Sequence, residues 1–314
     1  MAIIMHIDFN SFFASVEQQA NPFLRNKALV VGGKKKTDNF NRAIVAAASY
    51  QAKQKGIKTG MPIKQAKKLL PNLIIIPADP AKYAMATNKL LSILQNYTDQ
   101  IEQFSVDEAF VDLTKIVKDY MDATILSLKI KRDIINEVGQ FCPVSIGISS
   151  NKLMAKIASN SDKPNGLTVI PPHKINDFIL HQPLKNICGI GSKTAQKLAS
   201  IGVNNIKDLR AVPLQTLKFY FKNYGIFLYN AARGRGDYKI YPNNNMTKSI
   251  SHSYTFAYDL ELEAEIHTNL LAIADKVARK IRQKNLIAST IAILVKTREF
   301  KTCEKQITLS HGIN

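Results

Sequence analysis

The stretch FSVDEAFVDL, residues 104–113, places two adjacent acids, Asp107 and Glu108, inside a segment with the apolar spacing of a core strand. Successive side chains of a regular strand point to opposite faces, so both acids can serve one site only where the backbone turns, as in a tight hairpin. Two carboxylates in an apolar segment are costly to desolvate and repel each other unless cations lie between them. The stretch therefore predicts a sheet with a divalent-cation site at a strand end.

A third acid, Asp8, follows the apolar run IIMHI at residues 3–7, which is typical of a buried strand. If the two strands are neighbours, Asp8 joins Asp107 and Glu108. Three hard oxygen donors without histidine or thiolate favour magnesium or manganese over zinc. The alternative is a solvated sheet edge or a salt-bridged turn, in which the acids bind no ion.

The segments around these acids predict the fold class. Strands alternate with amphipathic helices over residues 1–170, which indicates an α/β or α+β layer with helices covering a sheet. Within this part, the alanine-rich stretch IVAAASYQAKQKG, residues 44–56, predicts a helix closed by Gly56. From 172 to 237 the segments are short, helical and punctuated by glycine, which predicts a separate helical module.

The C-terminal part predicts a second, smaller layer. SISHSYTF, residues 249–256, has the pattern of a strand, and EIHTNLLAIADKVARKI, residues 265–281, that of an amphipathic helix. The next strand-like stretch, STIAILVKTR (289–298), alternates, with isoleucine and valine on one side and Lys296 and Arg298 on the other. A basic face of this kind suits a sheet laid on a phosphate backbone.

Charge and cysteine content limit the partners and the compartment. The 314 residues carry a net charge of +19, which favours nucleic acid as the usual partner. An anionic membrane fits less well, because the sequence has neither an exposed amphipathic anchor nor an apolar run long enough to span a bilayer. Three isolated cysteines and an N-terminus without an export signal predict a reducing cytoplasm.

Four motifs together resemble one enzyme family. They are Asp8-Phe9 with SFFASVE (11–17), SVDEAFVDL (105–113), GISSNKLMAKIASNSDKPNG (147–166) and GIGSKTAQKLASIGV (189–203). In this order and at these separations they resemble the Y-family of translesion DNA polymerases, closest to the DNA polymerase IV branch. The likeness extends from residue 3 to about 310.

The resemblance implies a template-directed DNA polymerase of low fidelity that acts in damage tolerance by two-metal phosphoryl transfer. Asp8, Asp107 and Glu108 match the family's metal-binding carboxylates, and the backbone carbonyl of Phe9 matches a ligand of the metal on the nucleotide side. Two magnesium ions, with manganese as an alternative, would activate the primer 3′-hydroxyl and neutralise the triphosphate. Primer-template DNA and deoxynucleoside triphosphates are the implied partners.

Phe13 matches the family's steric gate, the ring that leaves no room for a ribose 2′-hydroxyl. A phenylalanine in an amphipathic helix is more often part of the core, and the motif match is what favours the gate. Its neighbour Phe12 is expected to pack in the core or to support the sugar.

Tyr50, Lys53 and Lys163 match family positions that contact the incoming triphosphate. The sequence departs from the family pattern here, because Ala47 and Lys53 stand where threonine and arginine are common. A lysine binds phosphate as a point charge without the planar fork of arginine, which puts the strength of triphosphate binding in doubt. The alternative for Tyr50 and Lys53 is an ordinary exposed helix face.

GIGSKTAQKL resembles a helix-hairpin-helix motif, which grips a DNA backbone without reading bases. In such a motif Gly189 and Gly191 let the chain approach a phosphate, beside the helix N-terminus and Lys193. The alternative is a simple helical hairpin.

The resemblance implies an α+β right hand with a ferredoxin-like palm, small fingers, a helical thumb and a partial βαβ-type little finger. The last domain looks incomplete at residue 314, the peptide that reaches the sliding clamp in relatives is not in this sequence, and a monomer is expected. The expected ranges are palm 1–20 and 80–168, fingers 21–79, thumb 169–237, linker 238–247 and little finger 248–314.

Two other functions compete with this one. A DNA-binding relative of the same fold, made inactive or weakly active by its short terminal domain, would keep the charge without the synthesis. A nucleotidyl cyclase also places carboxylates and two metals on a similar sheet, but GIGSK, the gate helix and the positive charge favour the polymerase.

Overall fold

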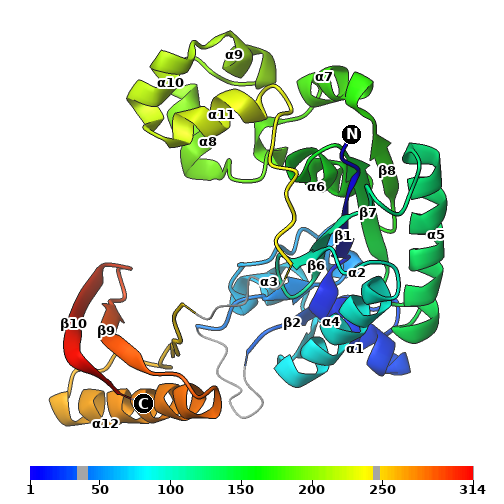
Figure 1. Cartoon of the computed structure of the whole chain (residues 1–314). Helices are drawn as coiled ribbons and strands as arrows, with labels where there is room; N and C mark the ends of the chain where they lie inside the picture. The colour runs from blue at the N-terminus through cyan, green and yellow to red at the C-terminus, as the bar shows by residue number, and fades with distance from the viewer. Residues whose placement is uncertain (34–41, 243–247, 314) are drawn as a thin grey trace. The chain divides into compact units, whose positions relative to one another are not determined.

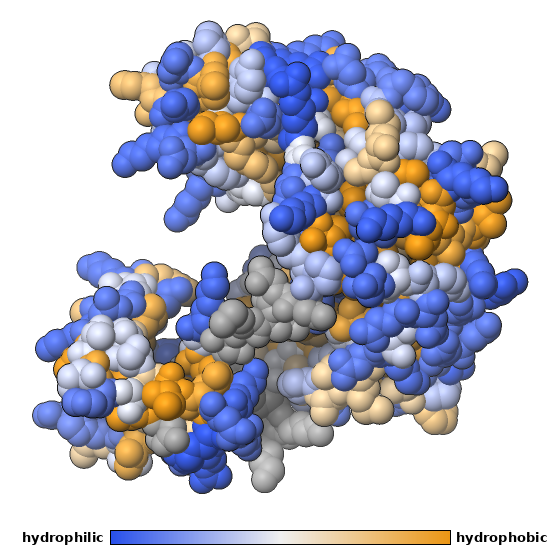
Figure 2. All heavy atoms as spheres, viewed as in Figure 1, coloured by the Kyte–Doolittle hydropathy of each residue, from blue (hydrophilic) through white to orange (hydrophobic). Residues whose placement is uncertain are grey.

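The computed structural model describes residues 1–33, 42–242 and 248–313, which fall into two compact units (Figure 1). The first unit holds the described residues up to 242 apart from Arg42, and the second holds Arg42 with 248–313. No helix in these ranges is long and apolar enough to span a membrane. Hydrophilic side chains cover much of the surface seen in Figure 2, in keeping with the high charge.

A mixed five-stranded sheet forms the centre of the first unit. Its middle strand, β1, pairs antiparallel with β6 and β7, while β7 and β8 run parallel. The strand order is β5 (Ile101–Gln103), β6 (Glu108–Asp112), β1 (Ile4–Phe9), β7 (Val144–Ser149) and β8 (Leu167–Ile170).

One face of this sheet carries the main hydrophobic core. The alternation of β1 directs Met5, Ile7 and Phe9 to this face, where all three are buried. The core includes residues of three helices, α1 (Phe12–Ala20), α4 (Pro80–Gln95) and α5 (Tyr120–Glu137). The apolar spacing seen in the sequence is therefore that of a sheet covered by helices.

The other face of the sheet lies under α6 (Lys152–Ser161), which packs on β1, β7 and β8. Asn151 caps this helix by accepting a hydrogen bond from the backbone N–H of Met154 at 3.0 Å. Gly147 on β7 lets the helix come close, because a Cβ there would lie 2.1 Å from the carbonyl oxygen of Ala155 and 2.2 Å from the nitrogen of Ser159. Both of these contacts are with helix backbone and cannot move aside alone.

Gly147→Ala is expected to lower the free energy of unfolding by about 3 kcal/mol, because the added methyl group must push α6 off the sheet. Urea unfolding would measure the change. Gly191→Ala is the matched control, since nothing lies within 4 Å of a Cβ at that position. Equal stability of the two variants would contradict the close contact of helix and sheet.

A smaller sheet has the order β3-β2-β4, formed by β2 (Leu29–Val31), β3 (Ala47–Ala48) and β4 (Ile74–Ile76). The helix predicted over residues 44–56 is therefore wrong in its first half. Ala47 and Ala48 pair with β2, and α2 (Tyr50–Gln54) begins only after Ser49, whose hydroxyl caps it. Strand pairing supplied by β2 outweighs the helix propensity of the alanines. The next helix is α3 (Ile63–Leu69).

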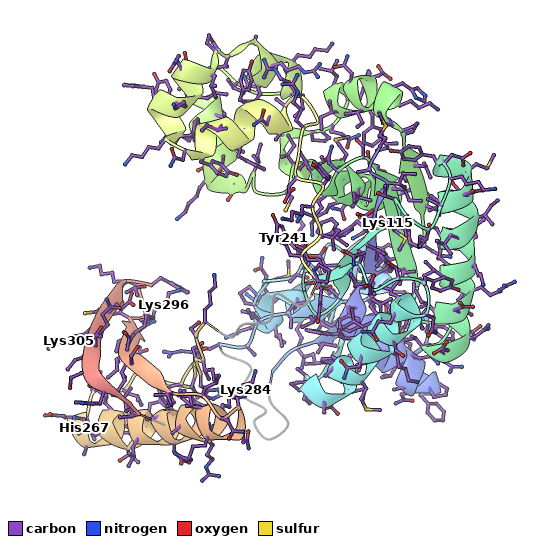
Figure 3. All side chains as sticks on the ribbon, in the orientation of Figure 1. Lys115, Tyr241, His267, Lys284, Lys296 and Lys305 are labelled. Atoms are coloured by element: carbon purple, nitrogen blue, oxygen red, sulfur yellow. The ribbon has the colours of Figure 1, made fainter. Side chains whose placement is uncertain are left out.

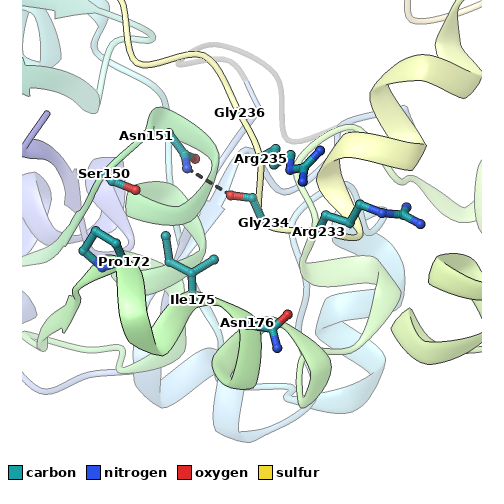
Figure 4. A pocket seen from close by; sticks show the side chains of 9 residues that line it. All are labelled: Ser150, Asn151, Pro172, Ile175, Asn176, Arg233, Gly234, Arg235 and Gly236. Carbon is teal, nitrogen blue, oxygen red and sulfur yellow. Dashed lines mark hydrogen bonds between the residues drawn. The ribbon is translucent and has the colours of Figure 1, made fainter. Parts of the chain in front are cut away.

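The helical module predicted after residue 171 has its own hydrophobic core, which also includes Leu153, Met154 and Ile157 of α6. Its helices are α7 (Pro172–Leu180), α8 (Ser192–Ala199), α9 (Ile206–Ala211), α10 (Leu214–Phe221) and α11 (Tyr224–Ala231). A groove of about 370 Å³ marks the junction of module and sheet, where the side-chain amide of Asn151 donates to the carbonyl of Gly234 at 3.0 Å (Figure 4).

The segment 237–241, which we call the strap, follows the helical module and lies against the main sheet. Ile240 is buried in a small cluster with Ile4, Phe110 and Ala155. The backbone N–H of Lys152 donates to the carbonyl of Asp237 at 2.8 Å, and that of Tyr241 donates to the carboxylate of Glu102 at 3.0 Å. The predicted linker 238–247 thus begins with residues that pack on the sheet, while 243–247 lie outside the described residues.

The second unit contains α12 (Glu263–Gln283) and an antiparallel pair of strands, β9 (Ala288–Lys296) and β10 (Thr302–Ile313). The strand predicted over 249–256 is wrong, because β9 and β10 pair only with each other among the described residues and offer that segment no partner. Lys296 ends β9, whereas Arg298 lies in the turn before β10. The two cations therefore do not share a strand face as predicted.

Candidate active site

Asp8 and Glu108 meet at one end of the main sheet. Asp8 is the penultimate residue of β1, and its Cα partner across the ladder is Glu108, the first residue of β6. Residues directly opposite each other on antiparallel strands point to the same face. Asp107 precedes Glu108 in the loop of the β5–β6 hairpin, and its carbonyl accepts a hydrogen bond from the backbone N–H of Phe9 at 2.9 Å. The backbone turns between the two adjacent acids, as their sequence requires.

Each of the three carboxylates has one oxygen held by the protein. The ammonium group of Lys163 donates to Asp8 Oδ1 at 2.7 Å, and the hydroxyl of Ser105 donates to Asp107 Oδ1 at 2.5 Å. Glu108 Oε2 accepts from His6 Nε2 at 3.0 Å and from Lys156. No described residue hydrogen-bonds to the second oxygen of any of these acids, so three carboxylate oxygens remain available to a ligand.

The environment shifts the pKa values of Asp8 and Glu108 in opposite directions. Burial raises the pKa of Asp8, Lys163 opposes this rise, and the nearby charge of Asp107 adds to it. Burial would also raise the pKa of Glu108, but the hydrogen bonds from His6 and Lys156 and the charge of Lys156 outweigh it and lower the pKa to about 2. Glu108 is therefore an anion at neutral pH, and Asp8 gains from any added positive charge.

Glu108 is expected to make the fold sensitive to acid. Its pKa of about 2 lies below the ordinary 4.5, so the carboxylate stabilises the fold at pH values above 4.5, and this contribution is lost as the pH falls toward 2. Near pH 7, Glu108→Gln should lower the free energy of unfolding by roughly 2–3 kcal/mol. Urea unfolding near pH 7 and near pH 2 would measure this; a difference from the parent that does not shrink in acid would contradict it.

The donor set fits a hard divalent cation. Ligand atoms of His6, Asp8 and Glu108 lie within 4.8 Å of one another, and the free atoms at the site are carboxylate oxygens, which magnesium and manganese prefer. Asp107, which was predicted to join Asp8 and Glu108, is not part of this cluster, although its charge raises the pKa of Asp8. The sequence reasoning did not identify His6, although its position two residues before Asp8 on a strand places both side chains on one face.

Phe12 and Phe13 differ in their surroundings at the start of α1. Phe12 is buried and stacks on Phe9, with ring centroids 5.0 Å apart. Phe13 is only partly buried and stacks on Tyr83 of α4 at 4.2 Å and 16°. The hydroxyl of Tyr83 donates to Glu17 at 2.9 Å, which fixes the ring behind Phe13. Tyr83 carries no motif and was missed by sequence reasoning.

Two lysines gather beside Asp8 from distant parts of the chain. Lys53 on α2 donates to the hydroxyl of Ser11 at 2.7 Å, and its ammonium lies 5.0 Å from the ring centroid of Tyr50. Burial lowers the pKa of Lys53, and the positive charge of Lys163 lowers it further. The positive charges of Lys53 and Lys163 thus act on each other at the edge of the acidic cluster. Ala47 lies on β3 next to this helix.

The glycine-rich turn lies across a groove from the acids. Gly189 has φ +101, which favours glycine, and Gly191 is the N-cap of α8, whose first turn contains Lys193. The groove, about 500 Å³, is lined by Lys156 and Asn160 of α6 on one side. On the other side lie the glycine-rich turn and the residues just before it, which are Lys185, Asn186, Ile187, Cys188 and Ile190. Because Lys156 also contacts Glu108, the groove leads to the carboxylates. Lys156, Asn160 and Lys185 are additions to the predicted set.

The remaining predicted cations lie in the second unit. Figure 3 shows Lys296 on β9 and Lys305 on β10. Lys296 lies 4.7 Å from the ring centroid of Phe300 in the same hairpin.

Comparisons with known proteins agree along nearly the whole chain. Residues 7–160 match the impB/mucB/samB family, residues 247–314 its C-terminal domain, and residues 185–235 the DNA polymerase-iota thumb domain. A DNA polymerase IV of Francisella tularensis subsp. holarctica is 35% identical over 305 residues, covering 97% of this chain and 85% of the relative. One from Listeria monocytogenes serotype 4b is 34% identical over 311 residues, covering 99% and 85%.

Solved structures of DNA polymerases also align with nearly the whole chain. A Y-family DNA polymerase chimera, Dbh-Dpo4(243-245)-Dbh, aligns with a TM-score of 0.89 and 29% identity, covering 99% of this chain and 89% of the other. An insertion ternary complex of Dbh DNA polymerase aligns with a TM-score of 0.73 and 28% identity over the same shares.

Proposed function

This chain belongs to the Y-family of DNA polymerases, in the DNA polymerase IV branch, and we propose that Asp8, Asp107 and Glu108 form its catalytic centre. It is a DNA-directed DNA polymerase of the translesion type, with the family's α+β fold and helix-hairpin-helix thumb, and DNA and deoxynucleoside triphosphates are its partners. The observation that supports the centre is that Asp8 and Glu108 come together from two neighbouring strands, each with one carboxylate oxygen held by the protein and one free.

We propose two magnesium ions as the metals, held by these acids and by the carbonyl of Phe9. When bound, magnesium supplies Lewis-acid activation of the primer 3′-hydroxyl and neutralises charge on the triphosphate. Manganese fits the same oxygen donors. Burial raises the pKa of Asp8, and a bound cation would lower it again by stabilising the charged carboxylate.

The other residues of the site bind and position the substrates. Lys53 and Lys163 attract the triphosphate by their charge, and Tyr50 orders Lys53 through its ring. Lys163 also donates to Asp8 Oδ1, and its ammonium group has two further N–H donors for a phosphate oxygen. The stacked Phe13 stands as a wall at the sugar, with Phe12 packed beneath it. In-line attack at the α-phosphorus then releases pyrophosphate.

Primer-template DNA is proposed to lie along the groove between α6 and the glycine-rich turn, where Gly189, Gly191 and Lys193 contact a backbone phosphate. Lys296 and Arg298 would add phosphate contacts from the second unit. We propose a monomer as the active form. The proposed parts are palm 1–20 and 80–168, fingers 21–79, thumb 169–237, linker 238–247 and little finger 248–314.

Primer extension by the 314-residue chain tests this function. With magnesium, we expect templated incorporation opposite an undamaged base and opposite an abasic site. Salt-sensitive DNA binding without any incorporation would favour the non-catalytic alternative instead. All three carboxylates are present in the described residues, so the site gives that alternative no support.

A further inference from the structure

His6 is a fully buried polar residue directly behind the carboxylates. It lies on β1 two residues before Asp8, on the face that α6 covers. Its Nε2 is 3.0 Å from Glu108 Oε2, and its Nδ1 is 2.7 Å from the hydroxyl of Ser159 on α6. Both ring nitrogens therefore have a partner, one of which is an acid of the catalytic centre.

Hydrogen-bond accounting fixes the direction of the contact with Glu108. A carboxylate can only accept, so His6 Nε2 carries a hydrogen and donates it. The hydroxyl of Ser159 lies 2.7 Å from Nδ1 and 2.9 Å from the carbonyl of Lys156, so α6 holds the far side of the ring. The ring of Phe110 packs against His6 with centroids 4.6 Å apart. Together these contacts leave the imidazole a single orientation.

The contact determines which oxygen of Glu108 is free. His6 and Lys156 both hydrogen-bond to Oε2, whereas Oε1 accepts no hydrogen bond from any described residue. We propose that His6, held by Ser159, is a positioning residue that fixes Glu108 so that Oε1 is presented to a divalent cation. This inference rests on the proposed metal-binding role of Glu108.

The alternative is that His6 is itself a metal ligand, since its ligand atom lies within 4.8 Å of those of Asp8 and Glu108. The hydrogen bonds of the two ring nitrogens of His6 argue against a role as metal ligand. Nε2 has no free lone pair while it donates to Glu108, and Nδ1 faces Ser159. An imidazole ligand would also shift the preference of the site from magnesium toward transition metals such as zinc.

Binding of Mn²⁺ tests the proposal apart from catalysis. Electron paramagnetic resonance would measure the affinity in a complex of the full chain with primer-template and a non-hydrolysable nucleotide. We expect His6→Phe, which keeps a ring but loses the donor, to weaken Mn²⁺ binding by about 10–100-fold. His6→Gln should recover most of the loss, because its amide nitrogen can reach the position of Nε2.

Two further variants distinguish an error in the proposed metal site from an error in the proposed role of His6. Ser159→Ala leaves the donor to Glu108 in place but frees the ring, so it should weaken binding in the same direction by a smaller factor. Glu108→Gln removes a proposed metal ligand, so it shows how large a loss of Mn²⁺ affinity to expect when the site itself is damaged. If Glu108→Gln leaves Mn²⁺ affinity unchanged, the proposed metal site is wrong.

If Glu108→Gln weakens binding but Ser159→Ala and a folded His6→Phe bind like the parent, the positioning role alone is wrong. Should His6→Phe fail to fold, an unchanged affinity in Ser159→Ala is enough to overturn the role. If His6→Gln fails to recover Mn²⁺ binding and zinc binding falls more than Mn²⁺ binding, His6 is a ligand rather than a positioning residue.

Discussion

Asp107→Asn is expected to lower the rate of nucleotide incorporation by at least about a thousandfold, equivalent to roughly 4 kcal/mol of transition-state stabilisation. The replacement keeps the shape of the side chain and its contact with Ser105, but removes a negative charge beside Asp8 that would attract the metal ions. Single-turnover primer extension with saturating magnesium and nucleotide measures the rate of this step.

Asp112→Asn is the matched control for this loss. Asp112 lies on the same strand pair at the opposite end of β6, where its carboxylate accepts a hydrogen bond from the backbone N–H of Thr114 at 2.8 Å. An amide oxygen can accept the same bond, so incorporation should stay close to that of the parent. Equal rates for Asp107→Asn and Asp112→Asn would show that the hairpin acid has no catalytic part.

Phe13→Ala is expected to reduce discrimination against ribonucleotides by at least about a hundredfold, close to 3 kcal/mol. The stacked pair of Phe13 and Tyr83 forms a rigid wall, and removal of the front ring opens space that a 2′-hydroxyl can occupy. Incorporation of deoxynucleotide should change far less, so the ratio of the two kcat/KM values is the measurement.

Tyr83→Phe provides the control for the gate. It keeps the ring behind Phe13 and removes only the hydroxyl that donates to Glu17. Sugar discrimination should therefore stay near that of the parent. If Phe13→Ala discriminates as strongly as Tyr83→Phe, some other side chain limits the sugar, and the assignment of Phe13 fails.

The sequence predicts the centre of the molecule well, because the signals there are local. Two adjacent acids in an apolar segment require a turn at that point, and the structure has a hairpin there, with Glu108 opposite Asp8. The alternation of β1 likewise identifies Met5, Ile7 and Phe9 as core residues. In these segments the spacing alone determines which side chains share a face.

The features that the sequence reasoning missed depend on distant partners. Residues 44–56 are rich in alanine, as a helix would be. Ala47 and Ala48 nevertheless form a strand, because they pair with the backbone of β2. His6 and Tyr83 belong to the site through contacts with Glu108 and Phe13, far away in the chain. Strand alternation places His6 on the face of Asp8, but neither its contact with Glu108 nor that of Tyr83 with Phe13 can be identified locally, since each forms only when the sheet and its helices assemble.

The strap fastens the chain that leaves the helical module to the main sheet. Ile240 of the strap is buried against Ile4 and Phe110, which lie on β1 and β6 of that sheet. Lys152 reinforces this anchor by ion pairs with Glu102 at 3.1 Å and Asp237 at 3.5 Å. The helical module is thus attached to the main sheet at both of its ends, by β8 before Pro172 and by the strap after Gly236, so any movement of the module relative to the sheet must bend both connections.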